Sequence, residues 1–88
     1  MPISRRYSIY ALKNLKDYQN YIGLSANVES RLKKHNAGKV RSTKSRRPFQ
    51  LIYQEHIGSL SEARMREKYF KSAAGGKYLE KRITEIAK

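Results

Sequence analysis

Arg31 and His35 are the first residues of this sequence whose types and spacing could do chemistry. They lie four residues apart in a stretch with helical periodicity, so they share one face of a helix. A guanidinium stays charged at working pH, and its planar fork suits a phosphate. We therefore expect Arg31 to stabilise charge on a phosphate and His35 to exchange a proton, whereas Lys33 and Lys34 point away. A solvated arginine and a structural histidine are the plain alternatives.

Glu67 is the candidate metal ligand. It shares a helical stripe with Ala63 and Phe70, which predicts that its carboxylate faces inward. The chain has only 7 Asp and Glu residues, so a two-metal site built from several carboxylates is not expected. One Mg²⁺ or Mn²⁺ ion suits a single carboxylate better, because Mg²⁺ usually keeps several waters. The structural alternative is a salt bridge with Arg64 or Lys71.

Phenols are the remaining candidates for acid–base work, and the chain has 7 tyrosines. An ordinary phenol has a pKa near 10, so only about one in a thousand is ionised at pH 7. A neighbouring Arg31, His35 or metal ion would favour the phenolate or accept its proton. Alternation along residues 7–12 predicts that Tyr7 packs in the core, and Tyr18 is expected at the surface or against a substrate.

The charge balance indicates a polyanionic partner. The 20 Lys and Arg residues outnumber 7 Asp and Glu, for a formal net charge of +13. Nucleic acid is the first candidate, because phosphate contacts and counterion release drive its binding. A membrane partner is not expected, because no run approaches the roughly 20 apolar residues of a spanning helix. No segment combines a continuous basic face with a strongly apolar one either.

A basic loop follows the first predicted helix and is expected to track the nucleic-acid backbone. Its candidate contacts are Lys39, Arg41, Thr43, Lys44, Arg46 and Arg47. The hydroxyl of Thr43 would add a contact to phosphate. A solvated loop is the alternative. Nothing in the sequence resembles a base-reading helix or a zinc finger, so strong sequence specificity is not expected.

Length and cysteine content limit the remaining possibilities. With 88 residues, the chain is expected to form a single domain over residues 1–88. It has no cysteine, which excludes a disulfide-linked partner and a thiolate site and suits the cytoplasm. The N-terminus lacks the apolar core of a secretory signal, so a cytoplasmic location is expected.

Hydrophobic periodicity predicts the elements that position these residues. Alternation predicts strands over residues 7–12, 20–24 and 49–56, and helical periodicity predicts helices between them and after them. The order is β-β-α-β-α-α, which predicts an α+β fold with a small three-stranded antiparallel sheet covered by helices. In the third strand, Phe49 and Tyr53 are expected on one face.

Caps and glycines predict where the helices begin and end. Ser25 or Asn27 caps the first helix and Gly38 ends it. Ser59 with Glu62 fits a capping box for the second helix, and Ser61 is an alternative cap.

Gly75 and Gly76 are expected to break the chain before a third helix over residues 77–88. Its inner stripe is predicted to be Leu79, Ile83 and Ile86. Gly23 inside a strand indicates a bulge or a close approach.

Two tripeptides of the expected hairpin resemble the paired motif of the GIY-YIG nuclease family. They are Ser8-Ile9-Tyr10 and Tyr21-Ile22-Gly23. The second is intact, whereas Ser8 stands where the first motif of the family has glycine. Further motifs of the family follow in the same order, at Arg31, at His35, and at Ala63 with Glu67. The resemblance spans residues 7–81 and is closest to the small, single-domain branch.

The resemblance implies a metal-dependent endonuclease that hydrolyses DNA phosphodiester bonds. Tyr10 and Tyr21 would line its site. We favour Tyr10 as the base that activates the attacking water, assisted by His35, and Tyr21 as a positioning partner; the reverse order of the two phenols stays open. Arg31 would clamp the phosphate, and Glu67 would hold the one Mg²⁺ or Mn²⁺ ion.

Two other functions compete with this hypothesis. The first is a basic module that binds DNA or RNA without catalysis, since Ser8 could narrow a site where glycine allows close approach. The second is a ribosome-associated basic protein. For an endonuclease, the DNA could be duplex, single-stranded or branched. A single site cuts one strand, so a double-strand break would need a dimer or a second encounter, and a separate protein could supply targeting.

Overall fold

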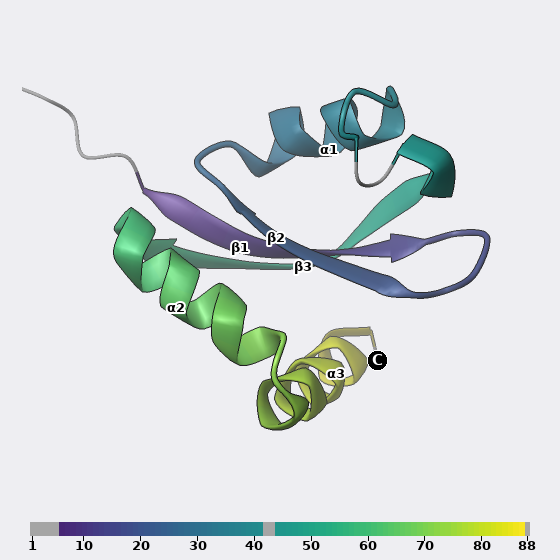
Figure 1. Cartoon of the computed structure of the whole chain (residues 1–88). Helices are drawn as coiled ribbons and strands as arrows, with labels where there is room; N and C mark the ends of the chain where they lie inside the picture. Colours follow the sequence, from purple (N-terminus) through teal and green to yellow (C-terminus); the bar gives the residue numbers. More distant parts are fainter. Residues whose placement is uncertain (1–5, 42–43, 88) are drawn as a thin grey trace, which may run out of the picture.

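A three-stranded antiparallel sheet with helices on both faces forms the fold (Figure 1). The computed structural model describes residues 6–41 and 44–87. The elements are β1 (Tyr7–Asn14), β2 (Asn20–Ser25), α1 (Val28–Asn36), the short 3₁₀ turn η1 (Lys44–Arg46), β3 (Phe49–Gly58), α2 (Leu60–Phe70) and α3 (Ala73–Ala87). The predicted fold class and element order are confirmed. Within the described ranges, no helix has the length and apolarity needed to cross a membrane.

β1 is the central strand and is buried on both of its faces. The sheet order is β2-β1-β3, with α1 over one face and α2 and α3 over the other. Ile9 and Ala11 pack on the α2 and α3 side. Tyr10 and Leu12 pack in a second cluster, which includes a buried residue of α1. The alternation predicted for β1 is therefore confirmed, and Tyr7 packs against the first cluster as expected.

The predicted faces of β3 are wrong. Phe49 packs with the cluster under α1, whereas Tyr53 packs with the cluster under α2 and α3. The register between β3 and β1 shifts at Ile52, which leaves one extra residue on β3. Such a bulge reverses the alternation of side chains, so residues on its two sides change faces.

The helix starts follow the predicted capping residues. Asn27, rather than Ser25, caps α1, because its side chain accepts a hydrogen bond from the third residue beyond it at 3.0 Å. Ser59 and Glu62 form the capping box of α2. Gly38 follows α1 with φ of 76°, a conformation that glycine adopts with little strain.

The predicted break at Gly75 and Gly76 is wrong, because both residues lie inside α3. The chain turns earlier, and the hydroxyl of Ser72 accepts a hydrogen bond from the Gly75 N–H at 3.2 Å. A Cβ on Gly75 would overlap the carbonyl oxygen of Tyr69 at the end of α2. The glycine therefore allows two helices to approach closely.

The inner stripe of α3 is shorter than predicted. Leu79 is buried and Ile83 packs against the same cluster. Ile86 is 59% exposed, so its assignment to the stripe is wrong. The apolar periodicity of the α3 sequence continues for one turn beyond the last residue of the helix that packs against the core.

Alanine at the two adjacent glycines of α3 is expected to change stability in opposite directions. Gly75→Ala should lower the free energy of unfolding by about 1–3 kcal/mol, because the new methyl group meets the Tyr69 carbonyl. Gly76→Ala should raise it by about 0.5–1 kcal/mol, because its Cβ has ordinary contact space and alanine favours the helix. Urea denaturation followed by circular dichroism measures both. Equal effects of the two variants would contradict the close approach.

Candidate active site

The phenol of Tyr10 lies across the neighbouring strand β2. Tyr10 is paired with Gly23 in the sheet. A Cβ on Gly23 would lie 2.5 Å from the Tyr10 hydroxyl and 2.6 Å from the ring carbon that bears it. Real Cβ contacts are longer than that, so only glycine leaves room for the phenol. The close approach predicted at Gly23 is therefore confirmed, and its partner is a side chain.

His35 meets Tyr10 beneath α1. Its Nε2 lies 3.1 Å from the Tyr10 hydroxyl, in hydrogen-bonding distance. The histidine is 0% exposed and Tyr10 is 1% exposed. The Tyr21 ring packs edge-on against His35 with 5.1 Å between ring centroids, and Phe49 lies 5.8 Å away in the same manner. Tyr10, Tyr21 and His35 thus form one cluster.

Arg31 and Glu67 bring opposite charges to the same phenol. Burial raises the pKa of Tyr10, the Arg31 guanidinium opposes this rise, and Tyr21 and Glu67 add to it. Burial also lowers the pKa of His35, and the positive charge of Arg31 lowers it further. Arg31 belongs to α1 and Glu67 to α2, which cover opposite faces of the sheet. Both charged groups therefore act on the pKa of the Tyr10 phenol.

Glu67 faces inward only in part. It belongs to the predicted stripe, but 25% of its side chain is exposed, and its carboxylate accepts a salt bridge from Lys71 at 3.3 Å. This salt bridge is one of the two that the sequence offered as alternatives to metal binding. Among residues 6–41 and 44–87, no group of three or more His, Cys, Asp or Glu could hold a metal ion. An ion at Glu67 would take most of its ligands from water and substrate.

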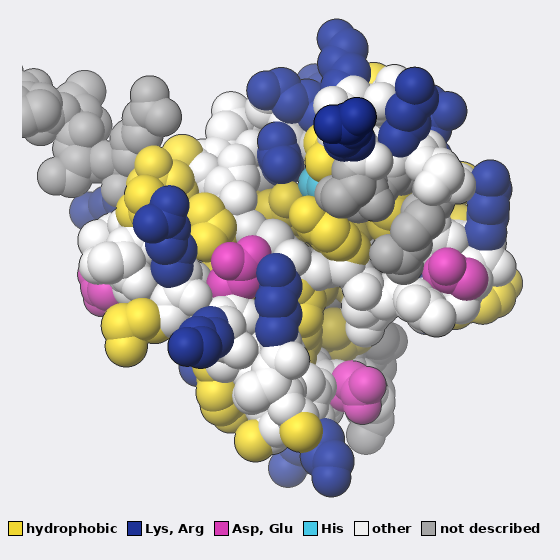
Figure 2. Space-filling view, in the orientation of Figure 1, with side chains coloured by type: hydrophobic (Ala, Val, Ile, Leu, Met, Phe, Trp, Pro, Cys, Tyr) yellow, Lys and Arg dark blue, Asp and Glu magenta, His cyan; other side chains and the backbone are white. Residues whose placement is uncertain are grey.

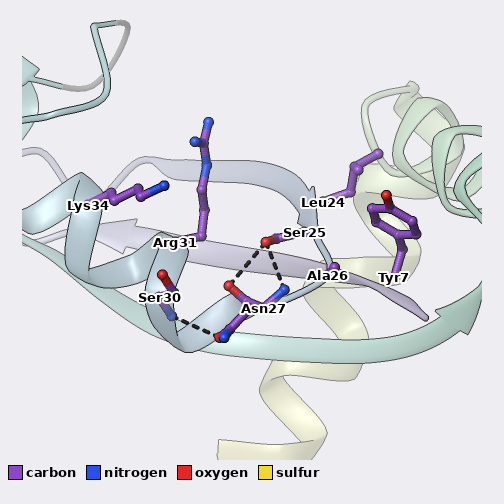
Figure 3. A pocket seen from close by; sticks show the side chains of 8 residues that line it. All are labelled: Tyr7, Leu24, Ser25, Ala26, Asn27, Ser30, Arg31 and Lys34. Atoms are coloured by element: carbon purple, nitrogen blue, oxygen red, sulfur yellow. Dashed lines mark hydrogen bonds between the residues drawn. The ribbon is translucent and has the colours of Figure 1, made fainter. Parts of the chain in front are cut away.

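A shallow hollow lies beside the N-terminal half of α1 (Figure 3). Its volume is about 350 Å³, and its lining comprises Tyr7, Leu24, Ser25, Ala26, Asn27, Ser30, Arg31 and Lys34. Lys34 and Arg31 extend from α1, and Tyr7 and Leu24 lie at the other end of the hollow. The expectation that Lys34 points away from the site is therefore wrong. The i, i+3 spacing of Arg31 and Lys34 was the signal that could have found it.

Exposed cations continue from α1 into the following loop. Figure 2 shows lysine and arginine side chains gathered over α1 and this loop. Of the residues predicted to contact a nucleic-acid backbone, Lys39, Arg41, Lys44 and Arg47 are exposed. Thr43 and the side chain of Arg46 lie outside the part that the structure describes. The buried side chain of Val40 holds the loop against the protein.

Ser8 is buried in β1 two residues before Tyr10, and its side chain is directed to β3. Its hydroxyl lies 2.9 Å from Nδ1 of His56 on β3. The backbone of Ser8 pairs with Ser25 on one side and His56 on the other. The serine hydroxyl is therefore held by β3, whereas the approach of Tyr10 depends on Gly23. Tyr18, in the β1–β2 turn, is 69% exposed, as the sequence predicted.

Comparison with known proteins identifies the family. The model of a family described as the GIY-YIG catalytic domain matches residues 6–84. A UPF0213 protein of Staphylococcus haemolyticus is 48% identical over 63 residues, which cover 70% of this chain and 76% of the relative. A UPF0213 protein of Syntrophus aciditrophicus is 38% identical over 80 residues, covering 89% and 90%. No solved structure matches significantly. The chain therefore belongs to the GIY-YIG family of nuclease domains.

Proposed function

We propose that this protein is a metal-dependent endonuclease that hydrolyses phosphodiester bonds of DNA. The observation that carries the proposal is the hydrogen bond between the Tyr10 hydroxyl and His35 Nε2, held over Gly23. Membership of the family and the formal net charge of +13 support a nucleic-acid substrate. Arg31 and Glu67 flank the phenol closely enough to influence its charge.

Tyr10 and His35 move the proton of the attacking water in this proposal. The lowered pKa of His35 leaves its imidazole neutral at neutral pH, so Nε2 has a lone pair for the phenolic proton, although burial disfavours the charged form of both groups. Tyr10 then takes a proton from the water, whose oxygen bonds to phosphorus as the bond to the leaving oxygen breaks. A phosphate bound beside Arg31 would offset the positive charge of the guanidinium, which disfavours protonation of His35. Tyr10 is 1% exposed, so substrate binding must open access to its oxygen.

Arg31, Lys34 and Tyr21 bind and orient the phosphate in this proposal. Arg31 and Lys34 line the same hollow, and a guanidinium can donate two parallel hydrogen bonds to phosphate oxygens. Tyr21 is half-buried and packs against His35, so it is the more exposed of the two tyrosines. The exposed cations of the following loop would bind phosphates further along the strand.

The residues present fit one hydrated divalent ion better than a protein-enclosed one. Glu67 is a partly exposed carboxylate within electrostatic reach of Tyr10, and Mg²⁺ commonly binds through one carboxylate, waters and substrate phosphate. Lys71 would have to release the carboxylate or share it. A bound Mg²⁺ or Mn²⁺ ion would supply neutralisation of charge at the phosphate and at the departing oxygen.

Arg31→Ala and Glu67→Gln are each expected to reduce DNA cleavage at least about 100-fold, because each removes a group that stabilises charge at the phosphate. Cleavage of plasmid, single-stranded and branched DNA with Mg²⁺ or Mn²⁺ measures the effect. Lys33→Ala and Glu80→Gln remove exposed charges from α1 and α3 and should cleave like the wild type. Cleavage that survives both Arg31→Ala and Glu67→Gln would contradict the proposed site.

The same experiment separates the competing function. A binding module without catalysis would bind DNA or RNA tightly and in a salt-sensitive manner, yet cut none of these substrates with any metal. That result from the wild-type protein would overturn the endonuclease proposal and favour the module.

His35 is expected to make stability depend on pH in the mildly acidic range. Its folded pKa lies below the ordinary value of 6.5, so the unfolded chain binds a proton first as the pH falls. The stability is therefore full above about pH 6.5 and declines from there toward the lower folded pKa, by up to about 1.4 kcal/mol per pH unit. His35→Gln should remove this part of the slope. Urea denaturation at pH 7.5 and 5.5 measures it.

His56→Gln is the matched control for this measurement. It removes the other histidine of the chain, which is exposed. A slope that is lost in His35→Gln and kept in His56→Gln assigns the pH dependence to His35. An unchanged slope in His35→Gln would show that a buried neutral imidazole is not present.

A further inference from the structure

The β1–β2 turn presents an aromatic ring to solvent in a backbone conformation that is unusual for tyrosine. Tyr18 is 69% exposed and has φ of 61°. Among the described residues other than glycine, it is the one with positive φ. Glycine or asparagine would adopt this conformation with less strain. The need for a turn therefore does not explain a tyrosine at this position.

Hydrogen bonds around Asn14 hold this turn in one conformation. The buried Asn14 side chain accepts from the N–H groups of Lys16 and Asp17 at 2.8 and 2.9 Å. The Asn14 carbonyl accepts from the Tyr18 N–H at 2.9 Å. The Gln19 N–H donates to the Asp17 carboxylate at 2.9 Å. Little backbone entropy would be lost if the ring of Tyr18 met a ligand, because the turn is already ordered.

A lysine side chain lies beside the exposed ring. The Lys13 ammonium lies 5.6 Å from the ring centroid of Tyr18, in the range of a cation–π contact. The Leu15 N–H donates to the carbonyl of Pro48 at 3.0 Å, which joins the turn to the end of the basic loop. A strand whose phosphates lie along that loop therefore comes near the ring.

We propose that Tyr18 stacks on an unpaired base of the DNA that the basic loop binds. This inference rests on the proposed function and names its substrate class: DNA with a single-stranded or frayed segment beside the cleavage point. Aromatic rings bind bases by stacking without reading their sequence, and a nearby cation strengthens the site electrostatically. A base within a continuous duplex cannot offer its face to the ring, so fully paired DNA should not use Tyr18.

The strand geometry predicts which base is involved. Tyr10 and Asn14 are four positions apart in β1, which is about 14 Å along the strand. This distance is several times the spacing of charges along one strand of DNA, so the turn lies more than one nucleotide from the phosphate at Tyr10. The stacked base is therefore not one of those at the bond that is cut.

Fluorescence of 2-aminopurine in a flap substrate tests this proposal directly. The probe is a duplex with a single-stranded flap that carries one 2-aminopurine, moved through successive flap positions. Titration in EDTA, with the DNA checked for integrity afterwards, measures binding and stacking without cleavage. Wild-type protein should quench the probe most strongly at one flap position, and more weakly at the positions on either side of it. Tyr18→Asn, which suits the left-handed turn, should abolish the quench and weaken flap binding roughly tenfold or more.

Three controls make the result decisive. Tyr18→Phe keeps the ring and should quench like the wild type. Gln19→Ala changes a neighbouring exposed side chain and should do the same. A fully paired duplex should bind Tyr18→Asn as it binds the wild type. If Tyr18→Asn quenches and binds the flap like the wild type, stacking is overturned while the nuclease proposal stands. If the wild type binds no DNA at all, both proposals are overturned.

Discussion

The absence of a side chain at Gly23 is the constraint on which the candidate site depends. A Cβ there would lie 2.5 Å from the Tyr10 hydroxyl, so the phenol could not lie across β2 and meet His35. The same crossing places the phenol where Arg31 and Glu67, from helices on opposite faces of the sheet, both influence its pKa. The missing Cβ thus allows Tyr10 to meet His35 within the electrostatic reach of Arg31 and Glu67.

The central position of β1 allows it to hold helices on both faces of the sheet around this contact. Because β1 is buried on both faces, alternate side chains anchor α1 on one side and α2 on the other. Arg66 of α2 strengthens the second attachment. Its guanidinium lies 2.7 Å from the Glu55 carboxylate of β3 and 4.5 Å from the ring centre of Phe70. Half-buried ion pairs of this kind fix geometry more than they add stability.

Local patterns were sufficient to predict most of this arrangement. Alternation predicted the two faces of β1, and the caps at Asn27 and Ser59 follow from hydrogen bonds within a few residues. The approach of Tyr21 and His35 also follows from the predicted hairpin and helix. The predictions that failed depend on packing between elements. The bulge at Ile52 depends on the register of β3 against β1, and Gly75 lies inside α3 because a glycine is needed there for the close approach to the end of α2.

The i, i+3 spacing of Lys34 from Arg31 could have indicated its place in the hollow, whereas the partner of Ser8 was inaccessible to periodicity. The Ser8 hydroxyl meets His56, 48 residues away, through a strand pairing that alternation cannot identify. The contact between Ser8 and His56 arises from the packing of β3 against β1.

Removal of the Tyr10 hydroxyl tests the proposal that Tyr10 is the base. Tyr10→Phe keeps the ring over Gly23 and removes only the hydroxyl that meets His35. The account predicts that the single-turnover rate of DNA cleavage with saturating Mg²⁺ falls at least about 100-fold while DNA binding is retained. Tyr69→Phe, on the exposed side of α2, should cleave at the wild-type rate. A Tyr10→Phe protein that cleaves within about twofold of the wild type would contradict the account.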